Sequence, residues 1–109
     1  MILLYYLKRK EKLVVKSRIL QKDRGEAIKD YNTITDNLSL HYVLYVHKPS
    51  IKDREFYSVE ITSCFEDDID SAFAFDISSI RTAAESIFQT LCSGQVTPCT
   101  LYDVLEDIL

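Results

Sequence analysis

Apolar and polar residues alternate along residues 38–48 and again along residues 55–63. A period of two is typical of a strand that buries one face. Each alternating run therefore predicts a strand. In the first run, one face carries Leu38, Leu40, Tyr42, Leu44 and Val46, and the other carries Ser39, His41, Val43, Tyr45 and His47. In the second run, Tyr57, Val59 and Ile61 oppose Ser58, Glu60 and Thr62.

Turn residues separate these runs from further strands. Apolar side chains alternate with cations along residues 12–20, which predicts another strand. A turn within residues 22–26, around Gly25, is expected to follow it. A return strand through Ile28, Tyr31 and Ile34 is then expected. Pro49 ends the run over residues 38–48, because proline has no N–H to donate to a neighbouring strand. The acidic residues 66–70 are expected to form a loop, and residues 72–77 a short fifth strand or an extended lead-in.

The spacing of apolar residues changes after residue 78 and predicts a helix. Ser78 or Ser79 is expected to cap its start, and Gly94 is expected to end it in a left-handed conformation. Polar residues, among them Arg81, Glu85 and Gln89, fall on the opposite face. The apolar stripe consists of Ile80, Ala83, Ala84, Ile87, Phe88, Leu91 and Cys92.

A second, shorter amphipathic helix is predicted after residues 97–100. Its apolar stripe is Leu101, Val104, Leu105 and Ile108, with Tyr102, Asp103, Glu106 and Asp107 facing outward. Thr100 and Asp103 resemble a capping box at its start. Strands followed by helices indicate an α+β fold, an antiparallel sheet of four to five strands with two C-terminal helices packed on one face. The chain of 109 residues is expected to form a single domain, strand-rich over 1–77 and helical over 78–109.

Composition excludes some function classes. Only two glycines are present, so the glycine-rich loops that hold nucleotide phosphates are absent. The apolar residues 1–7 are too few to span a membrane, and the cations follow them instead of preceding them, unlike a signal peptide. Three cysteines, an odd number, favour free thiols and a reducing compartment, so a cytoplasmic protein without a membrane span is expected.

Charge is distributed unevenly. Residues 1–54 contain twelve Lys/Arg and six Asp/Glu, a net charge of +6. Residues 55–109 contain one Lys/Arg and eleven Asp/Glu, a net charge of −10. The simplest interpretation is that a basic sheet and acidic helices partly neutralise each other. A nucleic-acid-associated protein that uses the basic half is an alternative, with Tyr5 and Tyr6 beside Lys8, Arg9 and Lys10. The overall pI of about 5.1 disfavours it.

Residues 96–107 read V-T-P-C-T-L-Y-D-V-L-E-D. This V-T-P-x-x-L-x-D-x-x-E-D pattern resembles the end of a family of small proteins of unknown function from clostridial Firmicutes. Residues 13–17 and the glycine turn after them are similar too, whereas residues 1–11 and 65–74 depart from the family. The resemblance implies a bacterial, intracellular protein and brings no catalytic residues with it.

Candidate chemistry is sparse. Cys99 lies close to a helix start, where a thiolate is favoured, so a thiol-dependent small enzyme is a second alternative. A buried Cys99 that seals the helix junction is the preferred interpretation, and Cys92 belongs to the apolar stripe. His41 and His47 share a strand face but lie roughly 20 Å apart, too far to bind one metal ion. We therefore expect no catalytic residues, no metal and no cofactor.

The favoured function is a non-catalytic protein-interaction or regulatory module that forms a homodimer, its partner being itself or another protein. The apolar residues 1–7 are difficult to leave in water, and exposed apolar patches often mark contact surfaces. Pairing this segment with a second copy is one solution, and extending the domain's own sheet is the other. The candidate interface residues are Leu3, Tyr5, Leu7, Lys8 and Arg9.

Overall fold

The computed structural model describes residues 25–48 and 54–109. In these ranges four strands are followed by two α-helices with a 3-10 turn between them: β1 (Glu26–Thr35), β2 (Leu38–His47), β3 (Phe56–Phe65), β4 (Asp68–Ser78), α3 (Arg81–Ser93), η1 (Pro98–Thr100) and α4 (Leu101–Ile108). The predicted α+β architecture is confirmed. The predicted strand over residues 12–20 and the interface residues Leu3, Tyr5, Leu7, Lys8 and Arg9 lie outside the described residues.

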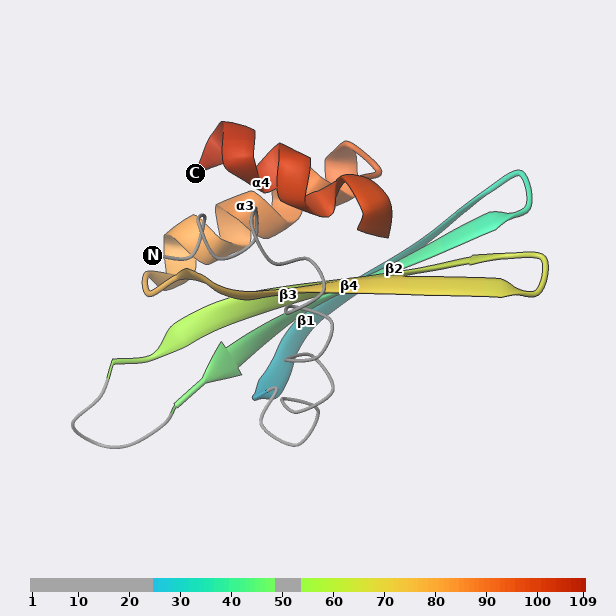
Figure 1. Cartoon of the computed structure of the whole chain (residues 1–109). Helices are drawn as coiled ribbons and strands as arrows, with labels where there is room; N and C mark the ends of the chain where they lie inside the picture. Colours follow the sequence, from blue (N-terminus) through green and yellow to red (C-terminus); the bar gives the residue numbers. More distant parts are fainter. Residues whose placement is uncertain (1–24, 49–53) are drawn as a thin grey trace.

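The four strands form one antiparallel sheet in the order β1-β2-β3-β4 (Figure 1). Two-residue turns connect β1 to β2 at Asp36-Asn37 and β3 to β4 at Glu66-Asp67. Asp36 and Glu66 have positive φ angles of 55° and 56°, as the first residue of a tight hairpin turn often requires. Both turns lie at the end of the sheet that projects beyond the helices (Figure 1).

The start of β4 corrects one expectation. The acidic residues 66–70 were expected to be a loop, yet only Glu66 and Asp67 form the turn, and Asp68 and Asp70 belong to an eleven-residue strand. Both carboxylates are exposed. Because this end of β4 extends past the helices, neither side chain has to enter the core. The expected short fifth strand over residues 72–77 is therefore the second half of β4.

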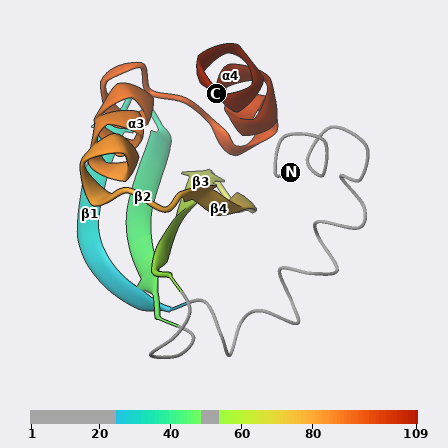
Figure 2. The same ribbon diagram turned by 90° about the vertical axis from the view of Figure 1, so that its left-hand side faces the viewer.

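One side of the sheet packs against both helices (Figures 1 and 2). Alternate residues of β2 and β3 point into this core, as the alternating pattern predicts. The hydroxyl of Tyr42 donates a hydrogen bond to the carbonyl oxygen of Val96 (2.9 Å), which connects the sheet to the link between the helices. Tyr42, Leu44, Val59, Ile61, Leu91, Leu101 and Leu105 are fully buried here.

The ends of α3 differ from the expected caps. Its N-cap is Ile80, with no side-chain cap, and neither serine caps it. Instead the Ser78 hydroxyl accepts a hydrogen bond from the N–H of Ile80 (3.0 Å), which turns the chain before the helix, and Ile80 is left 58% exposed. At the other end Gly94 keeps right-handed angles, and Gln95 has the positive φ of 50°.

The start of α4 also differs. The capping box forms one turn earlier, between Thr97 and Thr100, around Pro98 in η1. Tyr102, expected to face outward, is 8% exposed, because its hydroxyl reaches the carbonyl oxygen of Phe73 (3.4 Å) while its ring joins the core. Ile108, expected in the apolar stripe, is 41% exposed at the end of the helix.

The side of the sheet opposite the helices, here called the outer face, is also partly apolar. Val43 and Phe73 lie on it and are 7% and 3% exposed. The His47 ring stacks on Phe56 with centroids 4.6 Å apart, and Phe75 meets Phe56 edge-on at 5.0 Å. These rings gather at the end of the sheet away from the hairpin turns.

Candidate functional site

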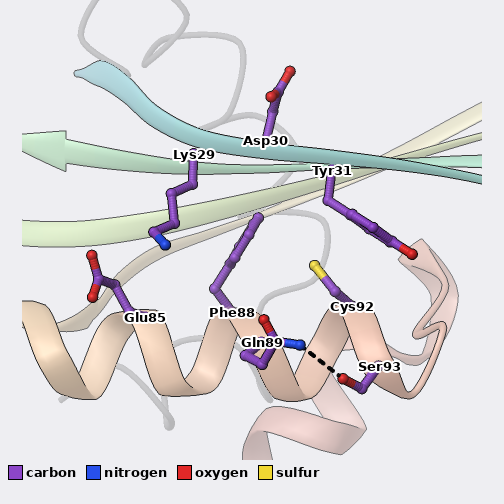
Figure 3. Close-up of a pocket in the computed structure, with 8 residues that line it drawn as sticks. All are labelled: Lys29, Asp30, Tyr31, Glu85, Phe88, Gln89, Cys92 and Ser93. Atoms are coloured by element: carbon purple, nitrogen blue, oxygen red, sulfur yellow. Dashed lines mark hydrogen bonds between the residues drawn. The ribbon is translucent and has the colours of Figure 1, made fainter.

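A groove of about 330 Å³ lies between β1 and α3 (Figure 3). Lys29 and Tyr31 of β1 point toward the helix, whereas Asp30 points away from it, as alternation along a strand requires. Phe88 and Cys92 form the apolar part of the groove. The complete lining is Lys29, Asp30, Tyr31, Glu85, Phe88, Gln89, Cys92 and Ser93.

Three polar side chains of this groove, those of Glu85, Gln89 and Ser93, take part in hydrogen bonds along α3. Glu85 accepts a hydrogen bond from the Arg81 guanidinium (3.0 Å), and Gln89 donates to Ser93 (3.1 Å). Burial raises the pKa of the Cys92 thiol to about 11, so at neutral pH it stays protonated and is a poor nucleophile. The groove is therefore a surface of mixed polarity, with Phe88 and Cys92 beside charged and polar side chains.

A second hollow of about 480 Å³ lies on the outer face beside a β-bulge, where the register of β1 shifts between Ala27 and Lys29. His41 and Asp30 meet in it, with 3.5 Å between Nε2 and Oδ2. Both side chains are substantially exposed, so this pair contributes little to stability. Its lining is Ala27, Ile28, Lys29, Asp30, His41, Val43 and Tyr45.

The remaining candidate residues are not brought together. Cys99 is exposed and not buried as expected, because it lies between Pro98 and Leu101, whose side chains take the positions facing the core. Its Sγ lies 3.4 Å from the Thr97 hydroxyl. His41 and His47 lie on the same face at separate places. No group of three His, Cys, Asp or Glu side chains suited to a metal ion occurs among the described residues.

The strand register brings together a set of residues that the sequence analysis did not connect. Ile34 is paired with Ser39, Ser39 with Cys64, and Cys64 with Ile69, so these four residues form one row across all four strands. The row lies on the outer face at the projecting end of the sheet. Ile34 is 75% and Ile69 73% exposed. We call this row, with the exposed carboxylates of the two turns beside it, the hairpin-end surface; the turn carboxylates are Asp36, Glu66 and Asp67, whereas Asp68 and Asp70 lie on the helix-facing side of β4.

Comparison with known proteins places the chain in a family. The model of one protein family, described as a family of unknown function (DUF6514), matches residues 10–109. The chain belongs to DUF6514. No curated protein and no solved structure matches this DUF6514 member. Within its described part, no helix combines the length and apolar character needed to cross a membrane.

Proposed function

We propose that this DUF6514 member is a non-catalytic protein-interaction or regulatory module that acts as a homodimer. The observation that carries the proposal is the hairpin-end surface, where Ile34 and Ile69 stand three-quarters exposed in one row of paired strands. A single exposed isoleucine is common on protein surfaces. Two isoleucines held in register on a rigid sheet form a patch, and such patches often mark contacts with other proteins.

The shape of the row supports a contact role. Neighbouring strands lie about 4.8 Å apart, so Ile34 and Ile69, in the two outermost strands, stand about 14 Å from each other. The residues between them, Ser39 and Cys64, are small and partly buried. The row is therefore a shallow trough with an isoleucine at each side, and a large apolar side chain from a partner fits between them.

The chemistry of the described residues supports a role without catalysis. Cys92 is buried with a raised pKa, and the hydroxyl of Tyr42, whose pKa burial raises to about 12, donates to a backbone carbonyl. These groups stabilise the fold. The proposal also includes a cytoplasmic location and a clostridial origin, to which the resemblance of the C-terminal V-T-P-x-x-L-x-D-x-x-E-D pattern points.

Within the described residues, charge does not favour a nucleic-acid partner, whereas the cations Lys8, Arg9 and Lys10 of the nucleic-acid alternative lie outside them. The described residues contain four Lys/Arg and fourteen Asp/Glu, a net charge of −10. Phosphate backbones require cations on the binding surface. The sheet and helices described here therefore suit a protein partner better than a nucleic acid.

The test replaces the two isoleucines. The double variant Ile34→Lys/Ile69→Lys places two charges in the proposed contact, and Ile80→Lys is the control, because Ile80 is also exposed (58%) but lies at the start of α3. Burying one isoleucine contributes about 1.5–3 kcal/mol, so loss of both should weaken the dimer at least tenfold. Sedimentation velocity measures the dissociation constant.

The control should keep the dissociation constant of the unaltered chain. Equal dimerisation of all three proteins would show that the hairpin-end surface is not the contact. Circular dichroism of each variant checks that the fold is retained.

A further inference from the structure

The hairpin-end surface combines exposed apolar side chains with an excess of negative charge. Its three carboxylates, Asp36, Glu66 and Asp67, occupy the two turns. None of the four described cations lies at this end: Lys29 is in the first half of β1, and the others, Lys48, Arg54 and Arg81, are at the opposite end of the sheet. Two copies that touched only through these surfaces would bring like charges together. A suitable occupant is therefore apolar and positively charged.

The chain itself contains such a segment. Residues 1–7 are all apolar or aromatic, and Lys8, Arg9 and Lys10 follow at once. Residues 1–24 as a whole contain eight Lys/Arg and two Asp/Glu, a net charge of +6, which complements the −10 of the described part. This segment lies outside the described residues.

We infer that the hairpin-end surface of one copy binds residues 1–10 of a second copy, and that two such contacts related by a two-fold axis hold the dimer together. The inference rests on the proposed homodimer and names its binding site. A large apolar side chain from Met1–Leu7 of the partner sits in the trough over Ser39 and Cys64. The adjoining cations of that segment then lie beside Glu66 and Asp67.

The proposed homodimer needs a contact between two chains, so a second copy is the source of the segment. The mixing experiment below distinguishes this contact from one within a single chain.

The contact is a small one. Burial of one tyrosine removes about 150–250 Å² from water. One such side chain in each of the two troughs therefore accounts for about 300–500 Å², and the neighbouring apolar residues of the segment have to supply the rest of the roughly 1,200 Å² that small specific interfaces bury in total.

A charge exchange in the full-length chain tests the inference. In the first variant, Lys8→Glu/Arg9→Glu, both cations of the segment become negative. In the second, Glu66→Lys/Asp67→Lys, two carboxylates of the surface become positive. Each variant alone should dimerise at least tenfold more weakly than the unaltered chain in 50 mM salt, because each then faces a like charge. An equimolar mixture should regain the affinity of the unaltered chain as a heterodimer, because both of its contacts again pair opposite charges.

The matched control moves the reversed charges to α4. The variant Glu106→Lys/Asp107→Lys changes the charge by the same amount on an exposed surface, and cations are tolerated in the last turn of a helix. Mixed with the first variant, it should not restore the affinity of the unaltered chain, because only one of the two contacts of that heterodimer pairs opposite charges. Native mass spectrometry distinguishes the pairs if one partner is isotope-labelled.

The outcomes separate this inference from the proposed function. If the unaltered chain dimerises but mixing the two reversed variants restores nothing, the segment does not bind this surface in trans, although the homodimer stands. If the α4 variant restores the affinity of the unaltered chain instead, the segment binds the acidic helix. If the unaltered chain is a monomer at all concentrations, the homodimer itself is wrong.

Discussion

At the scale of single residues, Asp76 is the clearest case of an unfavourable position. It lies where β4 bulges opposite β3, with a positive φ of 59°, and its N–H donates to the hydroxyl of the buried Ser58 (3.0 Å). Burial raises the pKa of the Asp76 carboxyl above its usual value. The folded state therefore disfavours the ionised form that predominates at neutral pH.

We predict that Asp76→Asn raises the free energy of unfolding at pH 7. Asparagine removes the partly buried charge and tolerates a positive φ. Because the folded pKa is raised, the unaltered chain loses stability as pH rises from below the unfolded value of about 3.9 through the folded value. The Asp76→Asn variant does not lose stability in this way. The two proteins should therefore have the same free energy of unfolding near pH 3, and the variant should have the higher value at pH 7.

Urea unfolding at several pH values measures the difference. Asp70→Asn, which changes an exposed aspartate of the same strand, is the control and should show no gain. A constant difference between pH 3 and pH 7, or a less stable Asp76→Asn, would mean that charge burial is not the cause.

At the scale of elements, each helix packs on the sheet through the apolar side chains on its sheet-facing side. Leu91 of α3 and Leu105 of α4 are fully buried. Removing either side chain to alanine leaves a cavity, and such changes cost about 2–5 kcal/mol. We predict this loss for Leu91→Ala and for Leu105→Ala in urea unfolding.

The exposed Ile80 provides the comparison, because Ile80→Ala should cost less than about 1 kcal/mol. If Leu91→Ala also lowered the free energy of unfolding by less than about 1 kcal/mol, the packing of α3 on the sheet would be contradicted.

The strands and helices differ in how well the sequence predicts them. β2 and β3 could be predicted closely, since both lie in the middle of the sheet and their alternate residues must enter the core. The start of β4 could not, because its charged residues lie on a projecting end with solvent on both sides. Tyr102 was missed because a tyrosine can bury its ring when its hydroxyl finds a partner, here the carbonyl oxygen of Phe73.

The hairpin-end surface could not be predicted from the sequence, because it depends on how the four strands are paired. Ile34 and Ile69 are 35 residues apart and meet in one row only because three strand pairings fall in a single register. The acidic residues Glu66 and Asp67 were visible in the sequence, but their place beside an apolar row was not. The basic, apolar segment at the start of the chain was identified from composition alone.

At the scale of the whole molecule, charge and apolar surface are complementary between the first 24 residues and the rest of the chain. Screened surface ion pairs contribute only about 0–1 kcal/mol each, so apolar burial must supply most of the dimer's stability. High salt should therefore weaken the homodimer only slightly.

Light scattering of the unaltered chain at micromolar concentration in 0.5 M salt tests the homodimer most directly. The predicted mass is twice the 12.6 kDa of one chain, and deletion of residues 1–7 should lower it toward that of the monomer. A full-length protein with the mass of one chain, or a shortened protein that stays fully dimeric, would contradict the account.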